Sequence, residues 1–233
     1  MTQTTRSPAA GPRQRRAAGL ARERRPGRPE GLLYVEADCP PELEGEFHAW
    51  YNLEHVPERL RIPGFVSGRR YAALEGGPRW LAAYELTSLA VLESAEYRQW
   101  LGGPLQTQWT TRMIAVTRVH RGLFRLADRR EAKVKAPESR GLLAVRYATS
   151  ADERRALSWW HDREFSRKLL ALPGVTGVAR YDGAEGDEGL ALYELEQPWL
   201  TQSPAFTKIW TAGWEARRAV LPSYRRTLYS RIL

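Results

Sequence analysis

Glu54, His55 and Arg70 lie close together in the sequence and carry side chains suited to enolate chemistry. A histidine titrates near neutral pH, and burial raises the pKa of a carboxyl group, so either group can exchange protons with a substrate. An arginine offers a planar pair of donors to a carboxylate or an enolate. We therefore predict that His55, Glu54 and Arg70 are catalytic residues.

Four aromatic residues near these positions are predicted to bind the substrate: Trp50, Tyr51, Tyr71 and Tyr84. Aromatic side chains fill cores as well as apolar ligand pockets, so Tyr84 also suits a core position. In the catalytic hypothesis the carboxyl and imidazole groups move protons, while Arg70 and Tyr71 hold the developing negative charge.

Each candidate also has a structural interpretation. Glu54 could form an internal ion pair with Arg70 or a neighbouring arginine, because a buried carboxylate needs a partner. A glutamate and an arginine recur at positions 164 and 180, which favours this interpretation. On a regular helix His55 points away from Trp50, although Pro57 can reorient the end of the helix. A local hydrogen bond is then the alternative role of this histidine.

No metal is predicted, because the histidines and acids near the candidate residues do not form a complete ligand set. His48 with His55, and His161 with Asp162 and Glu164, lack a convincing further ligand. Phosphate-binding glycine loops, serine elbows and catalytic Cys/His pairs are not found. We expect no cofactor, with heme as the alternative, since heme needs only one axial histidine in an apolar pocket.

The segment that carries Glu54 and His55 has helical spacing. Six residues fall on one side of a 3.6-residue helix: Phe47, Trp50, Leu53, Glu54, Pro57 and Leu60. This helix is expected to end or kink near Pro57 and again before residues 63 and 64. An apolar strand is expected at 31 to 37, and two further strands after the helix, the second around Tyr84.

The sequence repeats itself at an offset of about 110 residues. Residues 31 to 35 (GLLYV) match residues 141 to 145 (GLLAV), and the match continues through the helix and the following strand. Eight pairs share this register: Trp50/Trp160, Asn52/Asp162, Glu54/Glu164, Leu60/Leu170, Pro63/Pro173, Gly64/Gly174, Arg70/Arg180 and Tyr71/Tyr181. We therefore predict a tandem repeat.

Each copy is expected to follow the order β-α-β-β-α-β of a ferredoxin-like fold. The second helix is expected near 88 to 101 and 203 to 218, and the last strand at 114 to 126 and 224 to 232. We predict an α+β protein whose two ferredoxin-like repeats form an intramolecular dimeric α/β-barrel, because each sheet has one face to cover. The expected divisions are a disordered Arg-rich tail at 1–29, domains at 30–128 and 139–233, and a linker at 129–138.

The basic charge of the chain is concentrated in the tail. The formal net charge is +9, and residues 1 to 29 hold eight arginines and one glutamate, so the remainder is nearly neutral. Nucleic-acid binding is therefore expected only through the tail. The chain has one cysteine, no long apolar run and no export signal. We therefore expect a soluble cytoplasmic protein without a disulfide or a membrane span.

Residues 50 to 59 (WYNLEHVPER), 62 to 65 (IPGF) and 68 to 71 (GRRY) resemble the pattern of EthD-like proteins, which belong to the dimeric α/β-barrel superfamily. The resemblance covers residues 31 to 233 and is weaker in the second copy, where His161, Phe165 and Arg167 replace Tyr51, His55 and Pro57. It implies a ligand cavity between the first helix, the sheet and the second helix. Only positions that match the pattern inherit this role: Trp50, Glu54, His55, Arg70 and Tyr71.

The resemblance implies the fold more firmly than the reaction. The superfamily includes cofactor-free monooxygenases and cyclases of aromatic polyketides, muconolactone isomerases and heme-dependent relatives. We predict a cofactor-independent isomerase, cyclase, lyase or monooxygenase of small aromatic or polyketide-like carbonyl compounds. The alternatives are a non-catalytic carrier or sensor and a heme-binding protein. The chain is expected to be a pseudo-dimer by itself, with a homodimer as the alternative.

Overall fold

The computed structural model describes residues 28–133 and 138–233. The predicted tail, apart from residues 28 and 29, and residues 134–137 of the predicted linker lie outside the described residues. We refer to residues 28–133 as the N-terminal half and to residues 138–233 as the C-terminal half.

The two halves have the same order of strands, with helical segments after the first and the third strand of each half. The N-terminal half comprises β1 (Gly31–Asp38), η1 (Pro41–Leu43), α1 (Glu44–Trp50), η2 (Tyr51–His55), α2 (Val56–Arg61), β2 (Phe65–Glu75), β3 (Trp80–Leu86), η3 (Leu89–Glu93), α3 (Ala95–Trp100), α4 (Gln108–Val116) and β4 (Arg118–Glu131). The C-terminal half comprises β5 (Gly141–Ala148), α5 (Ala151–Trp160), η4 (His161–Phe165), α6 (Ser166–Leu170), β6 (Val175–Gly183), β7 (Glu188–Leu195), η5 (Pro198–Gln202), α7 (Pro204–Trp210), η6 (Thr211–Glu215), α8 (Ala216–Arg218) and β8 (Ser223–Arg231).

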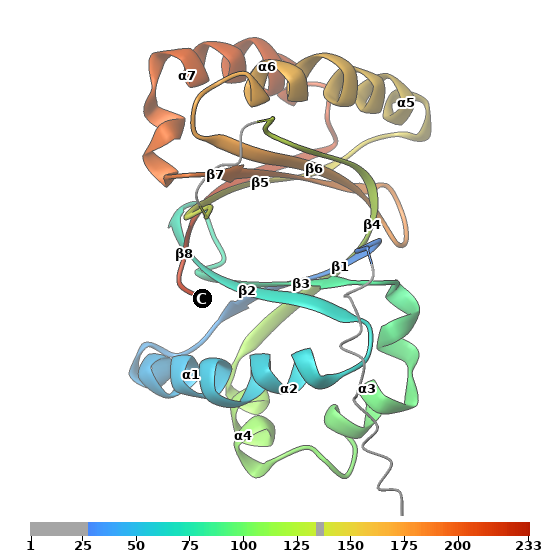
Figure 1. Cartoon of the computed structure of the whole chain (residues 1–233), viewed down its shortest axis with the longest axis vertical. Helices are drawn as coiled ribbons and strands as arrows, with labels where there is room; N and C mark the ends of the chain where they lie inside the picture. The colour runs from blue at the N-terminus through green and yellow to red at the C-terminus, as the bar shows by residue number, and fades with distance from the viewer. Residues whose placement is uncertain (1–27, 134–137) are drawn as a thin grey trace, which may run out of the picture.

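The eight strands close into one antiparallel barrel in the order β1-β3-β2-β8-β5-β7-β6-β4. Pairing of β2 with β8 and of β4 with β6 joins the two halves. Figure 1 shows this ring of strands between two helical layers, with α1 to α4 on one side and α5 to α7 on the other. The predicted α+β class is confirmed, and each half has the ferredoxin-like element order.

Alternating residues of the strands separate the apolar core into three layers. The barrel interior is filled by Leu32, Tyr34, Tyr71, Phe124, Tyr181, Leu190 and Tyr229, among others. The other face of each half-sheet packs against its own helices, through Leu33 and Val35 in one half and Leu143 and Val145 in the other. Successive strand residues point to opposite faces, so the apolar residues 31 to 35 of β1 serve both layers.

Both halves contain a π-helical turn between their first two α-helices. η2 joins α1 to α2, and η4 joins α5 to α6. Pro57 follows η2, but Arg167 stands at the matching place after η4, so proline is not required for the turn. The turn changes which residues face the sheet: Leu53 is 74% exposed and Leu60 is 44% exposed. The prediction that both lie on the buried side is therefore wrong.

The helices of both halves end at the predicted Pro-Gly pairs, where Gly64 and Gly174 have φ of 103° and 86°. A side chain at Gly64 would also meet Val91, since a Cβ atom there would lie 2.3 Å from it. These two glycines therefore allow the chain to turn from the helix into β2 or β6.

Two boundaries differ from the prediction. Strand β4 begins at Arg118 and continues to Glu131, so residues 129–131 lie in a strand rather than in the predicted linker. The single helix expected near 88 to 101 is replaced by η3 and α3, and α4 covers a segment where the last strand was expected to begin. Pairing with both β1 and β6 accounts for the length of β4.

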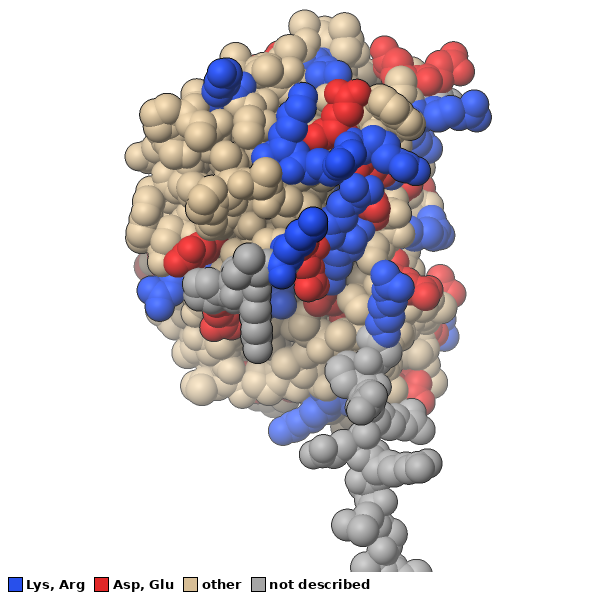
Figure 2. All heavy atoms as spheres, turned by 45° about the horizontal axis from the view of Figure 1, so that its top comes forward, with Lys and Arg blue, Asp and Glu red and all other residues tan. Residues whose placement is uncertain are grey.

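Charged residues of both signs lie together on the surface. Figure 2 shows Lys and Arg side chains interspersed with Asp and Glu on one face, beside a wide area without charge. Among the helices of the two described ranges, none has the length and apolar composition that crossing a bilayer requires.

Candidate functional site

The helical segment from α1 to α2 directs His55 and Arg59 into the layer between helices and sheet. η2 is closed by a bond from the Val56 amide to the Tyr51 carbonyl, one residue further back than in an α-helix. The wider turn stacks His55 on Trp50, with ring centroids 4.4 Å apart. The prediction that His55 points away from Trp50 is therefore wrong. Arg59 follows His55 by four residues, which places both on one helix face.

Four side chains of this layer have buried polar atoms without hydrogen-bond partners in the described part of the chain. These atoms are His55 Nδ1, Arg59 Nη1 and Nη2, Tyr84 Oη and Trp80 Nε1. They make up five of the seven such atoms in residues 28–133 and 138–233, so unpaired polar atoms are concentrated in this layer. Arg59 is 2% exposed and Tyr84 is 1% exposed. Buried polar groups are nearly always paired, and exceptions often mark a place for a ligand or an ion.

Arg70 enters the same layer from β2. It donates a hydrogen bond of 2.6 Å to Asn52 Oδ1, and its Nη2 lies 3.0 Å from His48 Nδ1. The guanidinium carbon lies 4.3 Å from the ring centroid of Tyr51. Burial is the main cause that lowers the pKa of His48, so its ring is neutral near pH 7. Both hydrogen-bond partners of Arg70 are therefore uncharged.

A glycine opposite Tyr84 gives this layer its shape on the sheet side. Gly68 of β2 pairs with Tyr84 of β3, and a Cβ atom at Gly68 would lie 3.0 Å from the tyrosine ring. In the C-terminal half, Val178 occupies the same register opposite Tyr193 and is buried. The N-terminal half thus lacks a side chain where the C-terminal half is packed.

The C-terminal half satisfies the polar groups that the N-terminal half leaves unpaired. Tyr193 Oη accepts a hydrogen bond of 2.6 Å from Trp214 Nε1 and lies 2.8 Å from His161 Nε2. Phe165 and Leu169, both buried, stand 110 positions after His55 and Arg59. The same fold is therefore stable with apolar residues at these two positions.

Arginine is also paired in the C-terminal half. Arg180, at the position that corresponds to Arg70, donates from Nε and Nη2 to the two carboxylate oxygens of Asp162, both at 2.9 Å. Burial raises the pKa of Asp162, but its hydrogen bonds with His161 and Arg180 and their charges lower it to about 2. The interpretation that Arg180 pairs with Glu164 is therefore wrong. Asn52 replaces this aspartate in the N-terminal half, which leaves Arg70 without a carboxylate there.

Burial sets the protonation states of the unpaired groups. Desolvation, followed by the charges of Arg59 and Arg70, holds the pKa of His55 well below its ordinary value. Desolvation likewise holds the pKa of Tyr84 well above its ordinary value. At neutral pH the layer thus combines a neutral imidazole, a protonated phenol and two guanidinium groups. Such a set can accept a proton and stabilise an oxyanion.

Two predicted site residues lie outside this constellation. Glu54 accepts hydrogen bonds of 2.6 Å from Thr107 Oγ1 and 2.8 Å from Thr110 Oγ1, and so binds the N-terminus of α4 rather than Arg70. Tyr71 follows Arg70 on β2 and therefore points to the opposite face, into the barrel interior. The predicted ion pair of Glu54 with Arg70 and the predicted cooperation of Arg70 with Tyr71 are both wrong.

The structure brings the other five predicted residues, Trp50, Tyr51, His55, Arg70 and Tyr84, into one layer, together with Arg59, which the sequence analysis did not select. A signal for it was present, since an arginine four residues after His55 is replaced by a leucine in the second copy. In the described ranges, no three histidine, cysteine or acidic residues are grouped to hold a metal ion.

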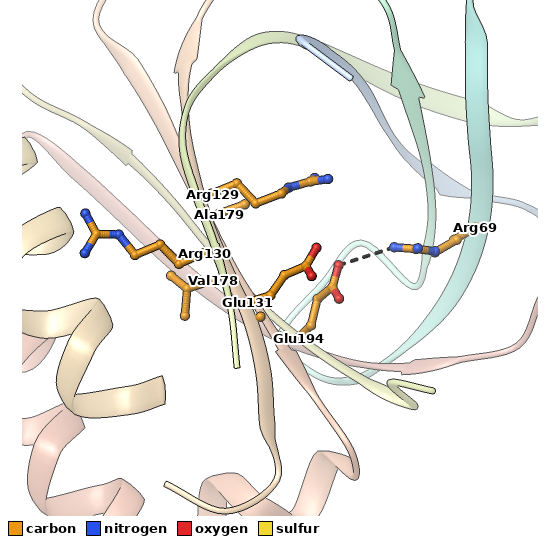
Figure 3. Close-up of a pocket in the computed structure, with 8 residues that line it drawn as sticks. Arg69, Arg129, Arg130, Glu131, Val178, Ala179 and Glu194 are labelled. Atoms are coloured by element: carbon orange, nitrogen blue, oxygen red, sulfur yellow. Dashed lines mark hydrogen bonds and ion pairs between the residues drawn. The ribbon is translucent and has the colours of Figure 1, made fainter. Parts of the chain in front are cut away.

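A second candidate lies at one opening of the barrel. A cavity of about 80 Å³ is bordered by Arg69, Arg129, Glu131 and Glu194. Figure 3 shows Arg69 and Glu194 facing each other across it, with the Arg69–Glu194 ion pair at 3.3 Å. Arg129 is bound to Glu85 at 2.5 Å. The volume suits a few water molecules, each of which occupies about 30 Å³. Arg69, Glu194 and Arg129 are paired and the space is small, so this cavity does not suit an aromatic ligand.

Comparison with solved structures identifies relatives in fold. An anthrone oxidase-like protein has a TM-score of 0.62 at 10% identity, with 87% of this chain and 91% of that chain aligned. A proposed monooxygenase from Fusobacterium nucleatum has a TM-score of 0.61 at 6% identity, covering 88% and 94% of the two chains. A proposed chlorite dismutase has a TM-score of 0.53 at 13% identity, covering 88% and 95%.

These neighbours are dimeric α/β-barrel proteins, and identities this low show a shared fold alone. No model of a protein family and no curated protein matches the sequence.

Proposed function

We propose that the chain is a tandem pair of EthD-like units whose N-terminal half binds a small aromatic carbonyl compound and catalyses proton transfer on it. The observation that carries the proposal is the concentration of unpaired buried polar atoms on His55, Arg59 and Tyr84. The C-terminal half has Phe165, Leu169 and a satisfied tyrosine at the corresponding places, so only the first copy is assigned the activity.

In the proposed reaction the neutral His55 ring accepts a proton from the carbon next to a carbonyl group. Tyr84, which keeps its proton, donates a hydrogen bond to the oxygen that becomes negative, and Arg59 and Arg70 stabilise the resulting enolate by their charge. Return of the proton at another position would make the protein an isomerase, and attack by the enolate would make it a cyclase or lyase. Reaction of the enolate with oxygen would make it a monooxygenase. No cofactor is proposed.

The similarity to an anthrone oxidase-like protein and to a proposed monooxygenase supports a small-molecule enzyme or binder. Trp50, Tyr51 and Tyr84 are proposed to contact the apolar part of the ligand, since all three belong to the buried cluster of this layer. Glu54 is proposed to act only by fixing α4.

The decisive experiment measures exchange of α-protons of aryl ketones, beginning with 1-tetralone, in deuterated water by NMR with the full chain. We expect catalysed exchange, and a loss of about 100-fold or more in His55→Phe, because that change removes the base and copies the residue of the other half. His120→Phe is the matched control, since His120 is exposed and lies on β4.

Other results would redirect the assignment. Ligand binding without exchange of any ketone would favour a carrier or sensor, and a Soret band on purification would favour the heme alternative. Equal exchange rates in the two histidine variants would remove His55 from the proposed mechanism.

A further inference from the structure

The N-terminal half holds two buried guanidinium groups that no carboxylate of the described residues neutralises. Arg59 and Arg70 are each 2% exposed. Both terminal nitrogens of Arg59 are without a hydrogen-bond partner in the described ranges, and the side-chain hydrogen-bond partners of Arg70 are the neutral groups of Asn52 and His48. An arginine cannot lose its proton under ordinary conditions, so the positive charge is permanent.

The fold itself does not require these charges. At the corresponding positions of the C-terminal half, Leu169 replaces Arg59 and Asp162 neutralises Arg180. Burial of an unpaired ion is strongly unfavourable. The N-terminal half nevertheless keeps these buried charges, although the fold does not need them. This indicates that an anion binds there and compensates them.

The chemistry of Arg59 indicates which anion fits. Its two terminal nitrogens form a planar fork that matches the two oxygens of a carboxylate. The guanidinium carbon lies 5.3 Å from the ring centroid of Tyr97, so an aromatic surface adjoins the fork. His55 and Tyr84, which also have unpaired buried polar atoms, are in the same layer.

We propose that the ligand of this site is an aryl carboxylate, held through its carboxylate by Arg59. The inference rests on the proposed function and specifies its substrate class. The second arginine, Arg70, adds charge complementarity, and each of its terminal nitrogens already has a hydrogen-bond partner, Asn52 or His48. The unpaired polar atoms are closed off from solvent, so binding requires a local rearrangement of the side chains around them.

The test compares binding of 1-naphthoate with that of its uncharged isostere 1-naphthamide to the full-length protein, by calorimetry and by thermal shift. We expect the acid to bind at least about tenfold more tightly than the amide, since hydrogen bonds to a charged partner are stronger than neutral ones. Arg59→Leu is expected to abolish this preference. Arg59→Lys is expected to retain part of it, because lysine keeps the charge and loses the fork.

Arg61→Leu is the matched control, since Arg61 is the exposed last residue of the same helix and should leave the preference unchanged. The unfolding temperature of the ligand-free variant shows whether a loss of binding is caused by misfolding. Arg59→Leu removes an unpaired buried charge and should therefore raise the unfolding temperature of the ligand-free protein, as Leu169 is tolerated in the other half.

Two results would overturn the inference: equal affinity for acid and amide, or an unchanged preference in Arg59→Leu. If neutral aryl ketones still bind and their binding is lost in His55→Phe, the proposed function stands and only the anionic substrate class fails. If neither acids nor ketones bind, both proposals fail.

Discussion

His55 and His161 differ in what their ring nitrogens contact. His161 has both nitrogens engaged, with Asp162 Oδ1 at 3.0 Å and Tyr193 Oη at 2.8 Å. His55 Nδ1 has no partner in the described ranges. A fully bonded histidine is a structural element, whereas an unpaired one is available to a ligand. His161 stands at the position that corresponds to Tyr51, and His55 at the position that corresponds to Phe165, so the two rings have different roles at different positions of the repeat.

The low pKa of His55 predicts how stability depends on pH. The unfolded chain binds a proton at this residue near pH 6.5, while the folded protein binds it only at lower pH. Unfolding therefore takes up a proton below about pH 6.5, and the free energy of unfolding falls as the pH is lowered. The loss is at most about 1.4 kcal/mol per pH unit for one group. We expect His55→Phe to show a smaller slope in urea unfolding between pH 7 and 5.

His161 and His48 also have lowered pKa values and contribute to the same slope, so the comparison uses the difference between wild type and variant. The His120→Phe protein should keep the wild-type slope. An unchanged slope in His55→Phe would show that the folded protein protonates this ring as readily as the unfolded chain does.

The sequence predicted several site residues because their types and order are distinctive. Trp50, His55 and Arg70 were identified from one motif and do share a layer. Arg59 was missed because a charged residue on a helix is normally assigned to the surface. Tyr71 was misplaced because adjacent strand residues face opposite ways, and the face that carries the site was not known from the sequence.

A buried hydrogen-bond chain connects the first helical segment with α4. Trp50 Nε1 donates to Thr110 Oγ1 at 2.9 Å, and Thr110 Oγ1 donates to Glu54 Oε1 at 2.8 Å. Thr107, the N-cap of α4, donates to the same carboxylate oxygen at 2.6 Å. The chain fixes the start of α4 against the π-turn that carries His55.

Replacement of Thr110 by valine should destabilise the protein. Thr110 is fully buried, and Thr110→Val leaves the indole N–H of Trp50 without an acceptor. Loss of a buried partner costs about 1 to 3 kcal/mol. Thr111→Val, at an exposed neighbour on the same helix, removes only solvent-exposed hydrogen bonds with Gln106 and the Thr107 carbonyl, and should change the free energy of unfolding by less than about 1 kcal/mol. Urea unfolding measures the free energies of both variants. Equal effects would contradict the role assigned to the hydrogen bonds of Thr110.

The order of helices and strands was predictable, and the π-turns were not. Apolar runs and Pro-Gly pairs marked β1, the end of α2 and the start of β2. A π-turn adds one residue to one turn, and a pattern based on 3.6 residues does not register it. The predicted buried side of the helix consequently drifted out of register after Trp50, which explains the exposed side chain of Leu53.

Charged groups inside the barrel connect the two halves. Glu36 of β1 is 1% exposed and binds Arg146 of β5 at 2.6 Å. Arg225 of β8 also pairs with Glu36, so one carboxylate contacts two strands of the other half. Tyr229 Oη lies 3.5 Å from the same carboxylate. This cluster adds polar contacts to the backbone pairing that closes the ring.

Glu36→Gln should destabilise the whole protein by about 3 kcal/mol, because Arg146 and Arg225 lose the buried charge that they share. Glu75→Gln is the control, since Glu75 also pairs across the halves, with Arg226, but is half-exposed, and its loss should cost less than about 1 kcal/mol. Chemical unfolding of both variants should show one transition, because a closed barrel gives neither half a separate sheet. Two separated transitions would contradict this coupling.

The presence of both halves in one polypeptide has a consequence for how such a site can arise. A symmetric assembly of two identical chains must carry each destabilising feature of its binding layer twice, because every mutation appears in both subunits. Here a mutation changes one layer alone. The unpaired arginines are confined to one side of the barrel, while Leu169 and the Arg180–Asp162 pair keep the opposite side fully packed. Covalent linkage thus lets natural selection adjust affinity in one layer and stability in the other independently.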